Sequence, residues 1–110
     1  NWKAAARYLT RVCEPGDTLV FGANAVWSCI VYYAPELADG AVEIIPYCNS
    51  LKELKSAAAS KRKVWFVTAY YGLYRPPLFF DWLQRNFRKS LKIPGNEPDN
   101  DIHIFVRENY

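Results

Sequence analysis

The sequence predicts a three-layer α/β/α sandwich of the flavodoxin or Rossmann type, with a mainly parallel sheet and a C-terminal antiparallel pair of strands. Short apolar runs, typical of strands buried on both faces, alternate with segments of helical periodicity. Strands that alternate with single helices are joined by right-handed crossovers, which produce a parallel sheet with helices on both faces. Because 110 residues suit one domain, we expect a single α/β domain over residues 1–110.

The first half of the chain contains two helical patterns and two strand patterns. Apolar residues recur at three and four residues from Trp2 to Cys13, and Pro15–Asp17 forms the tight turn that ends this pattern. Asn24 is a good N-cap residue for a second helix, which Pro35 ends because proline disfavours a helical residue before it. The elements expected here are a helix over 2–13, a strand over 18–21, a helix over about 25–33 and a strand over 42–45.

The second half contains two further helices and three strands. Ser50 and Glu53 form a capping box, S-x-x-E, which predicts the start of a helix. Pro76 and Pro77 suit the first turn of another helix. We expect that helix to bury Phe79, Trp82, Leu83 and Phe87. The strands are expected over 64–67, 91–93 and 102–106, with a polar loop over 94–101 that makes the last two an antiparallel pair.

Charge and composition limit the kinds of partner that we expect this domain to bind. The net charge is +3, and the densest basic run is Lys61–Lys63, with Arg85, Arg88 and Lys89 further along. Such runs are usually solvated helix ends, with anionic lipid head groups or phosphates as the alternative partner. No Lys/Arg stripe interleaves with aromatic residues, so we expect no nucleic-acid partner. The apolar runs are far shorter than the ~20 residues of a membrane helix, so we expect this piece to be soluble.

The three cysteines, Cys13, Cys29 and Cys48, are odd in number and lack C-x-x-C spacing. They therefore predict neither a disulfide framework nor a zinc site. Cys13 and Cys29 lie in apolar segments, where cysteine acts as a small apolar side chain. One disulfide with one remaining thiol is the alternative, and it would suit an oxidising compartment.

Ligands of open α/β sheets bind beyond the carboxyl ends of the strands. In this chain those ends are followed by Gly22–Asn24, Tyr47–Asn49 and the loop from Tyr70. Tyrosine rings can stack on sugars and arginine can bind phosphate through two hydrogen bonds. The candidate ligand-binding residues are therefore Asn24, Tyr70, Tyr71, Tyr74 and Arg75. The alternative is that these tyrosines pack under the loop or cover a partner or membrane surface.

No catalytic residue or cofactor is predicted in this domain. The sequence contains neither G-x-G-x-x-G nor G-x-x-x-x-G-K-[ST], and it has no G-x-S-x-G elbow. His103, the single histidine, alternates with apolar neighbours in the last strand, so we expect a solvent-facing or edge side chain. Asp99 and Asp101 form a D-x-D pattern that can hold a divalent cation, but a turn-rich loop contains such residues in any case, so we expect no metal.

Several segments, taken in order, resemble one family. They are Asn1–Leu9, Glu14–Val20, the pair Tyr32–Tyr33, Arg62–Val67 and Ile102–Arg107. Together they resemble the soluble C-terminal region of bacterial membrane glycosyltransferases of the dolichyl-phosphate-mannose–protein mannosyltransferase-like (GT-C) superfamily. The W-[RK]-x-A-A-x-Y-[LIV] helix, the P-G-D turn, the aromatic pair and the R-V-W-[LF]-V strand of that region have counterparts here. Because the chain begins at Asn1 and has no Met, we also expect it to be a domain of a longer protein.

The resemblance implies a location and a role. The domain would follow the last membrane helix on the extracytoplasmic face of the bacterial cytoplasmic membrane. Its partners would be the membrane-embedded remainder of the same chain and, in addition, a lipid-linked sugar or an acceptor glycan. The family's catalytic acidic residues lie between membrane helices, so none is carried over to this sequence. The 94–101 loop and the cysteines are not part of the family pattern.

Two other functions stay open at this stage. One is a stand-alone, non-enzymatic module of flavodoxin-like shape that binds a small anion or sugar at Gly22–Asn24 and Tyr70–Arg75. The other is a metal-dependent transferase that uses Asp99 and Asp101.

Overall fold

The computed structural model describes residues 1–59, 62–69, 77–95 and 101–109. Each expected helix and strand is present within these ranges, together with a short 3-10 helix that the sequence did not predict. In chain order the elements are α1 (Trp2–Val12), β1 (Thr18–Phe21), α2 (Asn24–Tyr33), η1 (Pro35–Ala38), β2 (Glu43–Ile45), α3 (Leu51–Ala59), β3 (Lys63–Thr68), α4 (Pro77–Asn86), β4 (Arg88–Ile93) and β5 (Ile102–Glu108).

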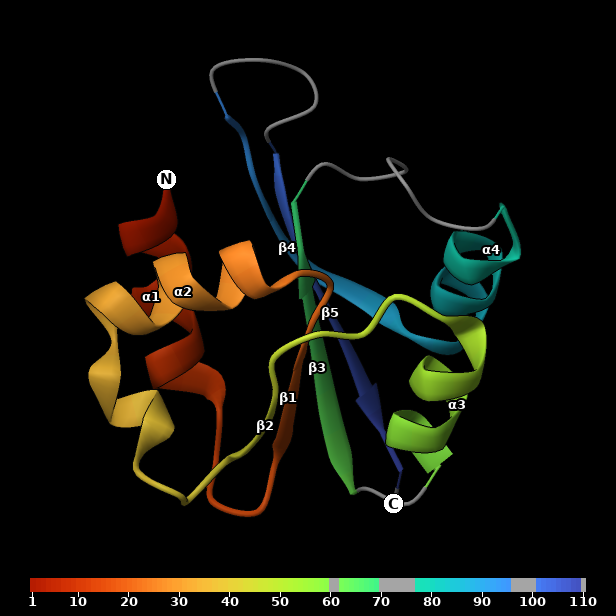
Figure 1. Cartoon of the computed structure of the whole chain (residues 1–110), viewed down its shortest axis with the longest axis horizontal. Coiled ribbons are helices and arrows are strands. Elements are labelled where there is room, and N and C mark those ends of the chain that lie inside the picture. The colour runs from red at the N-terminus through yellow and green to blue at the C-terminus, as the bar shows by residue number, and fades with distance from the viewer. Residues whose placement is uncertain (60–61, 70–76, 96–100, 110) are drawn as a thin grey trace.

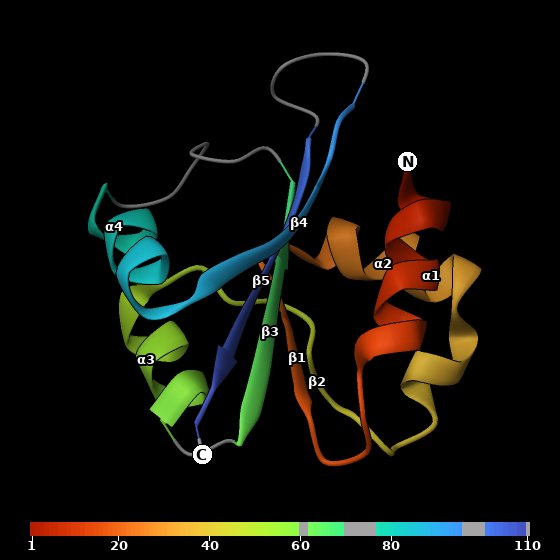
Figure 2. The ribbon, with the colours of Figure 1, turned by 180° about the vertical axis from the view of Figure 1, so that it is seen from behind.

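The strands of the described residues form one mixed sheet of five strands in the order β2-β1-β3-β5-β4. β1 pairs in parallel with β2 and β3, whereas β5 runs antiparallel to both β3 and β4 (Figures 1 and 2). The predicted mixture of a parallel sheet and a C-terminal antiparallel pair is therefore confirmed. The last strand does not extend the sheet at its edge but lies between β3 and β4, an order that the sequence left open.

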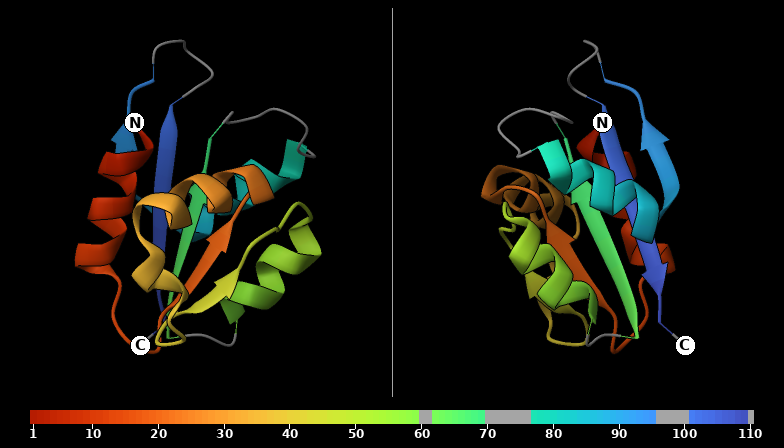
Figure 3. Two further views of the ribbon diagram at one scale, coloured as in Figure 1. Left: turned by 60° about the vertical axis from the view of Figure 1, so that its left-hand side comes forward. Right: turned by 90° about the vertical axis from the view of Figure 1, so that its right-hand side faces the viewer.

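Helices cover both faces of the sheet. α1 and α2 lie side by side on one face, and α3 and α4 lie on the other (Figures 1 and 3). Because successive residues of a strand point to opposite faces, the buried strands contribute to an apolar cluster on each side. In β1, for example, Leu19 and Phe21 pack with α1 and α2, while Val20 packs with α3 and α4. The burial of every residue of β1 confirms its predicted two-sided core position.

Side-chain caps begin two of the helices, and the sequence predicted the second of them. The Asn1 side chain accepts a 3.0 Å hydrogen bond from the Ala4 N–H at the start of α1. The Ser50 hydroxyl oxygen accepts a 3.1 Å bond from the Glu53 N–H, so the serine half of the predicted capping box is present at α3. The tight turn before β1 is also confirmed, and Gly16 adopts a φ of 91° there, a value that favours glycine.

The predicted capping role of Asn24 is wrong. Ala23 is the N-cap of α2 and makes no side-chain capping bond, while Asn24 is the exposed first residue of the helix. β1 ends at Phe21, and only Gly22 and the extended Ala23 separate it from the first residue of the helix. Asparagine tolerates the first helical turn, and its N-cap preference was overridden by the length of the connection between β1 and α2.

Two expectations near α4 also need correction. Phe87 is buried as predicted, but it lies after the end of α4 rather than on it. β4 begins at Arg88, three residues before the predicted strand. It is an edge strand with exposed charges and a register irregularity between Lys89 and Leu91, so the period-two pattern that identifies a strand is interrupted.

His103 is buried, with 7% of its surface exposed, and the prediction of a solvent-facing or edge histidine is wrong. The alternation along β5 is real, because Ile102 and Ile104 pack on the α1–α2 side while Phe105 packs on the α3–α4 side. On the side of β5 that holds His103, Phe105 packs with the α3–α4 cluster, and the His103 ring stacks on the Phe105 ring with centroids 6.4 Å apart. Strand alternation by itself does not show whether the second face meets solvent or a second layer of helices.

The basic run and the cysteines differ in part from expectation. Lys63 is the first residue of β3, and its side chain is only 12% exposed, so it is not a solvated helix end.

The structure forms no disulfide among Cys13, Cys29 and Cys48. Cys48, rather than Cys13 or Cys29, is the most deeply buried cysteine. In the part of the chain that the structure describes, no helix has the length and apolar character needed to cross a membrane.

Candidate functional site

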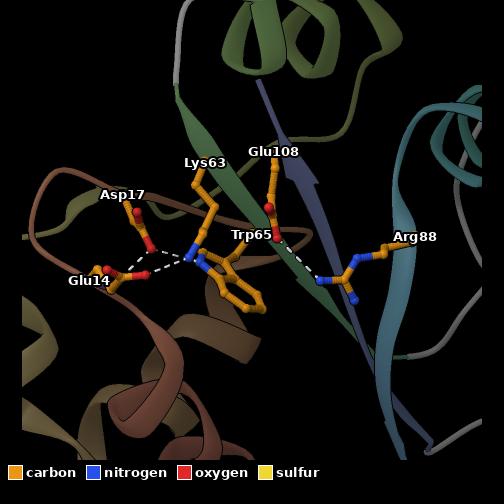
Figure 4. A network of polar contacts seen from close by, with 6 residues as sticks. All are labelled: Glu14, Asp17, Lys63, Trp65, Arg88 and Glu108. Carbon is orange, nitrogen blue, oxygen red and sulfur yellow. Dashed lines mark hydrogen bonds and ion pairs between the residues drawn. The ribbon is translucent and has the colours of Figure 1, made fainter. Parts of the chain in front are cut away.

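A polar cluster joins the start of β1 to the start of β3 (Figure 4). Asp17 is 6% exposed, and its Oδ2 accepts hydrogen bonds from the Glu14 N–H at 2.9 Å and from Trp65 Nε1 at 3.0 Å. Lys63 Nζ donates to Glu14 Oε1 at 2.7 Å. These residues come from the turn after α1 and from β3, two of the segments that carry the family resemblance.

The geometry of this polar cluster fits a role in stabilising the fold. The buried Asp17 carboxylate already accepts two hydrogen bonds, which compensate for its removal from water. Lys63 lowers the pKa of the Glu14 carboxyl through a hydrogen bond and its positive charge. We therefore assign these residues to the fold rather than to a reaction.

The sequence placed the predicted ligand site beyond the opposite, carboxyl ends of β1 and β3. Strand order reverses between them, because the chain continues from β1 to β2 on one side and from β3 to β4 on the other. The Gly22 N–H donates a 3.0 Å bond to the Val67 carbonyl, which holds the two strand ends together. Asn24 is exposed two residues later, at the first turn of α2.

The other predicted ligand residues, Tyr70, Tyr71, Tyr74 and Arg75, lie outside the described residues. The chain reaches this end of the sheet at Ala69, directly after β3. The structure thus places Asn24 at the expected end of the sheet, and its grouping with the tyrosines stays a prediction.

Asp101, one half of the predicted D-x-D pattern, is engaged in contacts within the chain. It accepts a 2.9 Å hydrogen bond from the Gly95 N–H through Oδ1, and its Oδ2 lies 3.4 Å from Lys92 Nζ. The Gly95 hydrogen bond, followed by the interactions with Lys92, lowers the pKa of Asp101. Asp99 lies outside the described residues, so a metal site that uses both aspartates stays untested. Among the residues described, no group of three or more His, Cys, Asp or Glu side chains could hold a metal ion.

An exposed group of aromatic side chains on the α1–α2 layer was not predicted as a site. Tyr32 is 78% exposed and Tyr33 is 49% exposed, and their rings meet edge to face with centroids 4.9 Å apart. With Trp2 and Cys29 they line a hollow of about 330 Å³. We call these four residues the aromatic patch. A helical tyrosine pair next to Pro35 was the available sequence signal, but one helix cannot show which of its faces is left uncovered.

Comparisons with known proteins identify no family for this chain. No protein family matches the sequence, and none of the curated proteins matches it. Among solved structures, the chain is similar to a release-factor-specific protein-(glutamine-N5) methyltransferase from Alicyclobacillus acidocaldarius, with 17% sequence identity and a TM-score of 0.41. The alignment covers 98% of this chain and 90% of the other. The fold itself defines the class of protein: an α/β domain with a mixed five-stranded sheet in its described part.

Proposed function

We propose that this chain is an accessory extracytoplasmic domain of a polytopic membrane glycosyltransferase that transfers a sugar from a polyprenyl-phosphate carrier. The observation that carries the proposal is the ordered series of segments that resembles the GT-C C-terminal region, from Asn1–Leu9 to Ile102–Arg107. The sugar transfer itself belongs to the membrane-embedded remainder of the same chain, with this domain on the extracytoplasmic face of the bacterial cytoplasmic membrane.

The contacts of the motif residues support an accessory rather than a catalytic role. The P-G-D turn and the R-V-W-like strand are 48 positions apart at Asp17 and Trp65, yet these two side chains are hydrogen bonded to each other. In this chain the two motifs form one buried contact, which suits a role in holding the fold together. Tyr32 and Tyr33, the aromatic pair that also belongs to the resemblance, differ because they are exposed and can contact a surface outside the domain.

The coding sequence upstream of Asn1 provides the first test. Multiple apolar spans of about 20 residues, with acidic residues in an early loop, are expected if the chain follows a membrane-embedded transferase. A short upstream region without such spans would overturn the proposal. If the spans are present, transfer of sugar from a series of different polyprenyl-phosphate sugars by membranes that contain the full-length protein tests the activity directly.

A flavodoxin-like binding module remains a second candidate, because strand order reverses beside Asn24. We expect sugar phosphates to shift the NMR signals of residues near Gly22–Asn24 if this site binds them. Tyr71→Ala and Arg75→Ala should each reduce those shifts. Shifts that persist in both variants would remove the tyrosine-rich loop from the site, and an absence of shifts in the wild-type chain would remove the candidate.

A further inference from the structure

The aromatic patch exposes large side chains on the outside of the α1–α2 layer. Tyr32 and Tyr33 end α2, while Trp2 begins α1 and Cys29 lies one turn before the tyrosines. The two helices pack side by side, so residues distant in sequence form one continuous surface (Figure 3). Exposed tyrosines of this kind present an apolar ring and a polar hydroxyl together, which suits a surface that is partly apolar and partly wet.

The charges next to the patch are positive. α1 carries Lys3, Arg7 and Arg11, and neither α1 nor α2 contains an acidic residue. Lys3 and Arg7 are exposed and are four residues apart, so they lie on one face of α1. Arg11 lies over the Tyr8 ring, with its guanidinium carbon 5.5 Å from the ring centroid.

Lys3 follows Trp2 of the patch directly in α1, and its side of the helix can be located from a contact further along. Thr10 follows Lys3 by two helical turns and lies on the same side of the helix. The Thr10 hydroxyl is 3.5 Å from a Glu36 carboxylate oxygen in η1, the element that follows α2. The Lys3–Thr10 row therefore faces the α2–η1 segment. Glu36 is thus an acidic group beside this row, and it lies at the Thr10 end, away from Trp2.

We propose that the aromatic patch, with Lys3 and Arg7 beside it, docks on the surface of a bilayer that contains anionic phospholipids. The tyrosine and tryptophan rings would lie at the level of the head groups, where such side chains are enriched in membrane proteins. The two cations would contact the negative head groups. This inference stands on the patch and its charges and does not require the parent protein to be a glycosyltransferase.

Vesicle flotation of the 110-residue chain tests the proposal, with circular dichroism to verify that every variant is folded. We expect binding to vesicles of phosphatidylcholine with phosphatidylglycerol, and little binding to phosphatidylcholine alone. Replacing both tyrosines, as Tyr32→Ser with Tyr33→Ser, should weaken binding by about tenfold or more. Replacing Lys3 and Arg7 by glutamine should weaken it by about fivefold for each charge removed, and should reduce its dependence on salt.

Leu78→Ser provides the matched control. Leu78 is 66% exposed on α4, which covers the opposite face of the sheet, so its replacement removes a comparable exposed apolar side chain away from the patch. We expect this variant to bind as the wild type does. Equal losses for Leu78→Ser and the tyrosine variant would overturn the proposal, as would the absence of binding to anionic vesicles.

Cys29 gives a second measurement that requires no change to the patch. If the patch docks on lipid, anionic vesicles should slow maleimide modification of Cys29 in the wild-type chain by about tenfold, since the thiol lines the same hollow. An unchanged rate would contradict docking. The patch could instead mediate self-association. The wild type would then form a dimer in the absence of lipid, the tyrosine substitutions would abolish that dimer, and the wild type would not bind vesicles. This result would also overturn the proposal. Upstream spans without vesicle binding would reject this inference alone, and vesicle binding without such spans would reject only the proposed function.

Discussion

The indole N–H of Trp65 donates a 3.0 Å hydrogen bond to the carboxylate of Asp17. This contact joins the turn that precedes β1 to the neighbouring strand β3, and Asp17 also receives the Glu14 N–H at 2.9 Å. Because Asp17 and Trp65 are both almost fully buried, neither group can exchange this bond for water without opening the structure.

Replacing Asp17 should therefore destabilise the fold. We expect Asp17→Ala to lower the free energy of unfolding by roughly 2–4 kcal/mol, because it leaves the Trp65 and Glu14 N–H groups without their acceptor. Urea unfolding followed by circular dichroism measures this change. Glu14→Gln is the control: the Glu14 side chain is 70% exposed, so loss of its ion pair with Lys63 should cost less than about 1 kcal/mol. Equal effects of the two substitutions would contradict the structural role of Asp17.

The Asp17–Trp65 hydrogen bond can be isolated by a double-mutant cycle. Trp65→Phe removes the N–H donor and keeps an aromatic ring in the core. If the two side chains interact as described, the cycle with Asp17→Ala should give a coupling free energy of about 1–2 kcal/mol. Additive effects within about 0.5 kcal/mol would show that the two side chains act independently.

The three cysteines should differ in reactivity. Burial, followed by the nearby negative charge of Asp17, raises the pKa of the Cys13 thiol to about 12, so almost no reactive thiolate forms at this residue near neutral pH. Cys48 is fully buried. We therefore expect maleimide to modify Cys29 first in the folded chain and all three cysteines after unfolding, as measured by mass spectrometry of peptides. Cys13 modification as fast as that of Cys29 would contradict this assignment.

His103 should make stability depend on pH. Burial, followed by the positive charge of Lys89, lowers the pKa of His103 below its usual 6.5, although Asp101 acts in the opposite direction. The unfolded chain therefore binds a proton at a higher pH than the folded chain does. We expect the free energy of unfolding to fall as the pH decreases from 6.5 through the lower folded-state pKa, with this contribution fully present above 6.5.

His103→Gln is the variant that tests this pH dependence. Urea unfolding at a series of pH values should show a smaller slope for the variant just below pH 6.5, whatever the change in its absolute stability. That window lies above the range in which ordinary carboxyl groups titrate. A slope that equals that of the wild type would show that the histidine is not the group responsible.

The turn at Asp17 and the strand at Trp65 lie far apart in the sequence but meet in the structure. Their contact is a tertiary relationship that no local pattern predicts. The loop from Tyr70 to Arg75 and the D-x-D pattern lie partly or wholly outside the described residues, so those predictions remain for experiment.

The sequence by itself determined the nature and order of the helices and strands, since apolar periodicity, the Gly16 turn and the Ser50 cap act over a few residues. It also determined that β1 is buried on both faces. Only the tertiary structure decided that β5 lies between β3 and β4, which buries His103 and leaves charged β4 at the edge. It also decided that Tyr32 and Tyr33 stay exposed beside Trp2. The physical reason is that pairing and coverage depend on residues far apart in the chain, whereas periodicity and capping depend on near neighbours.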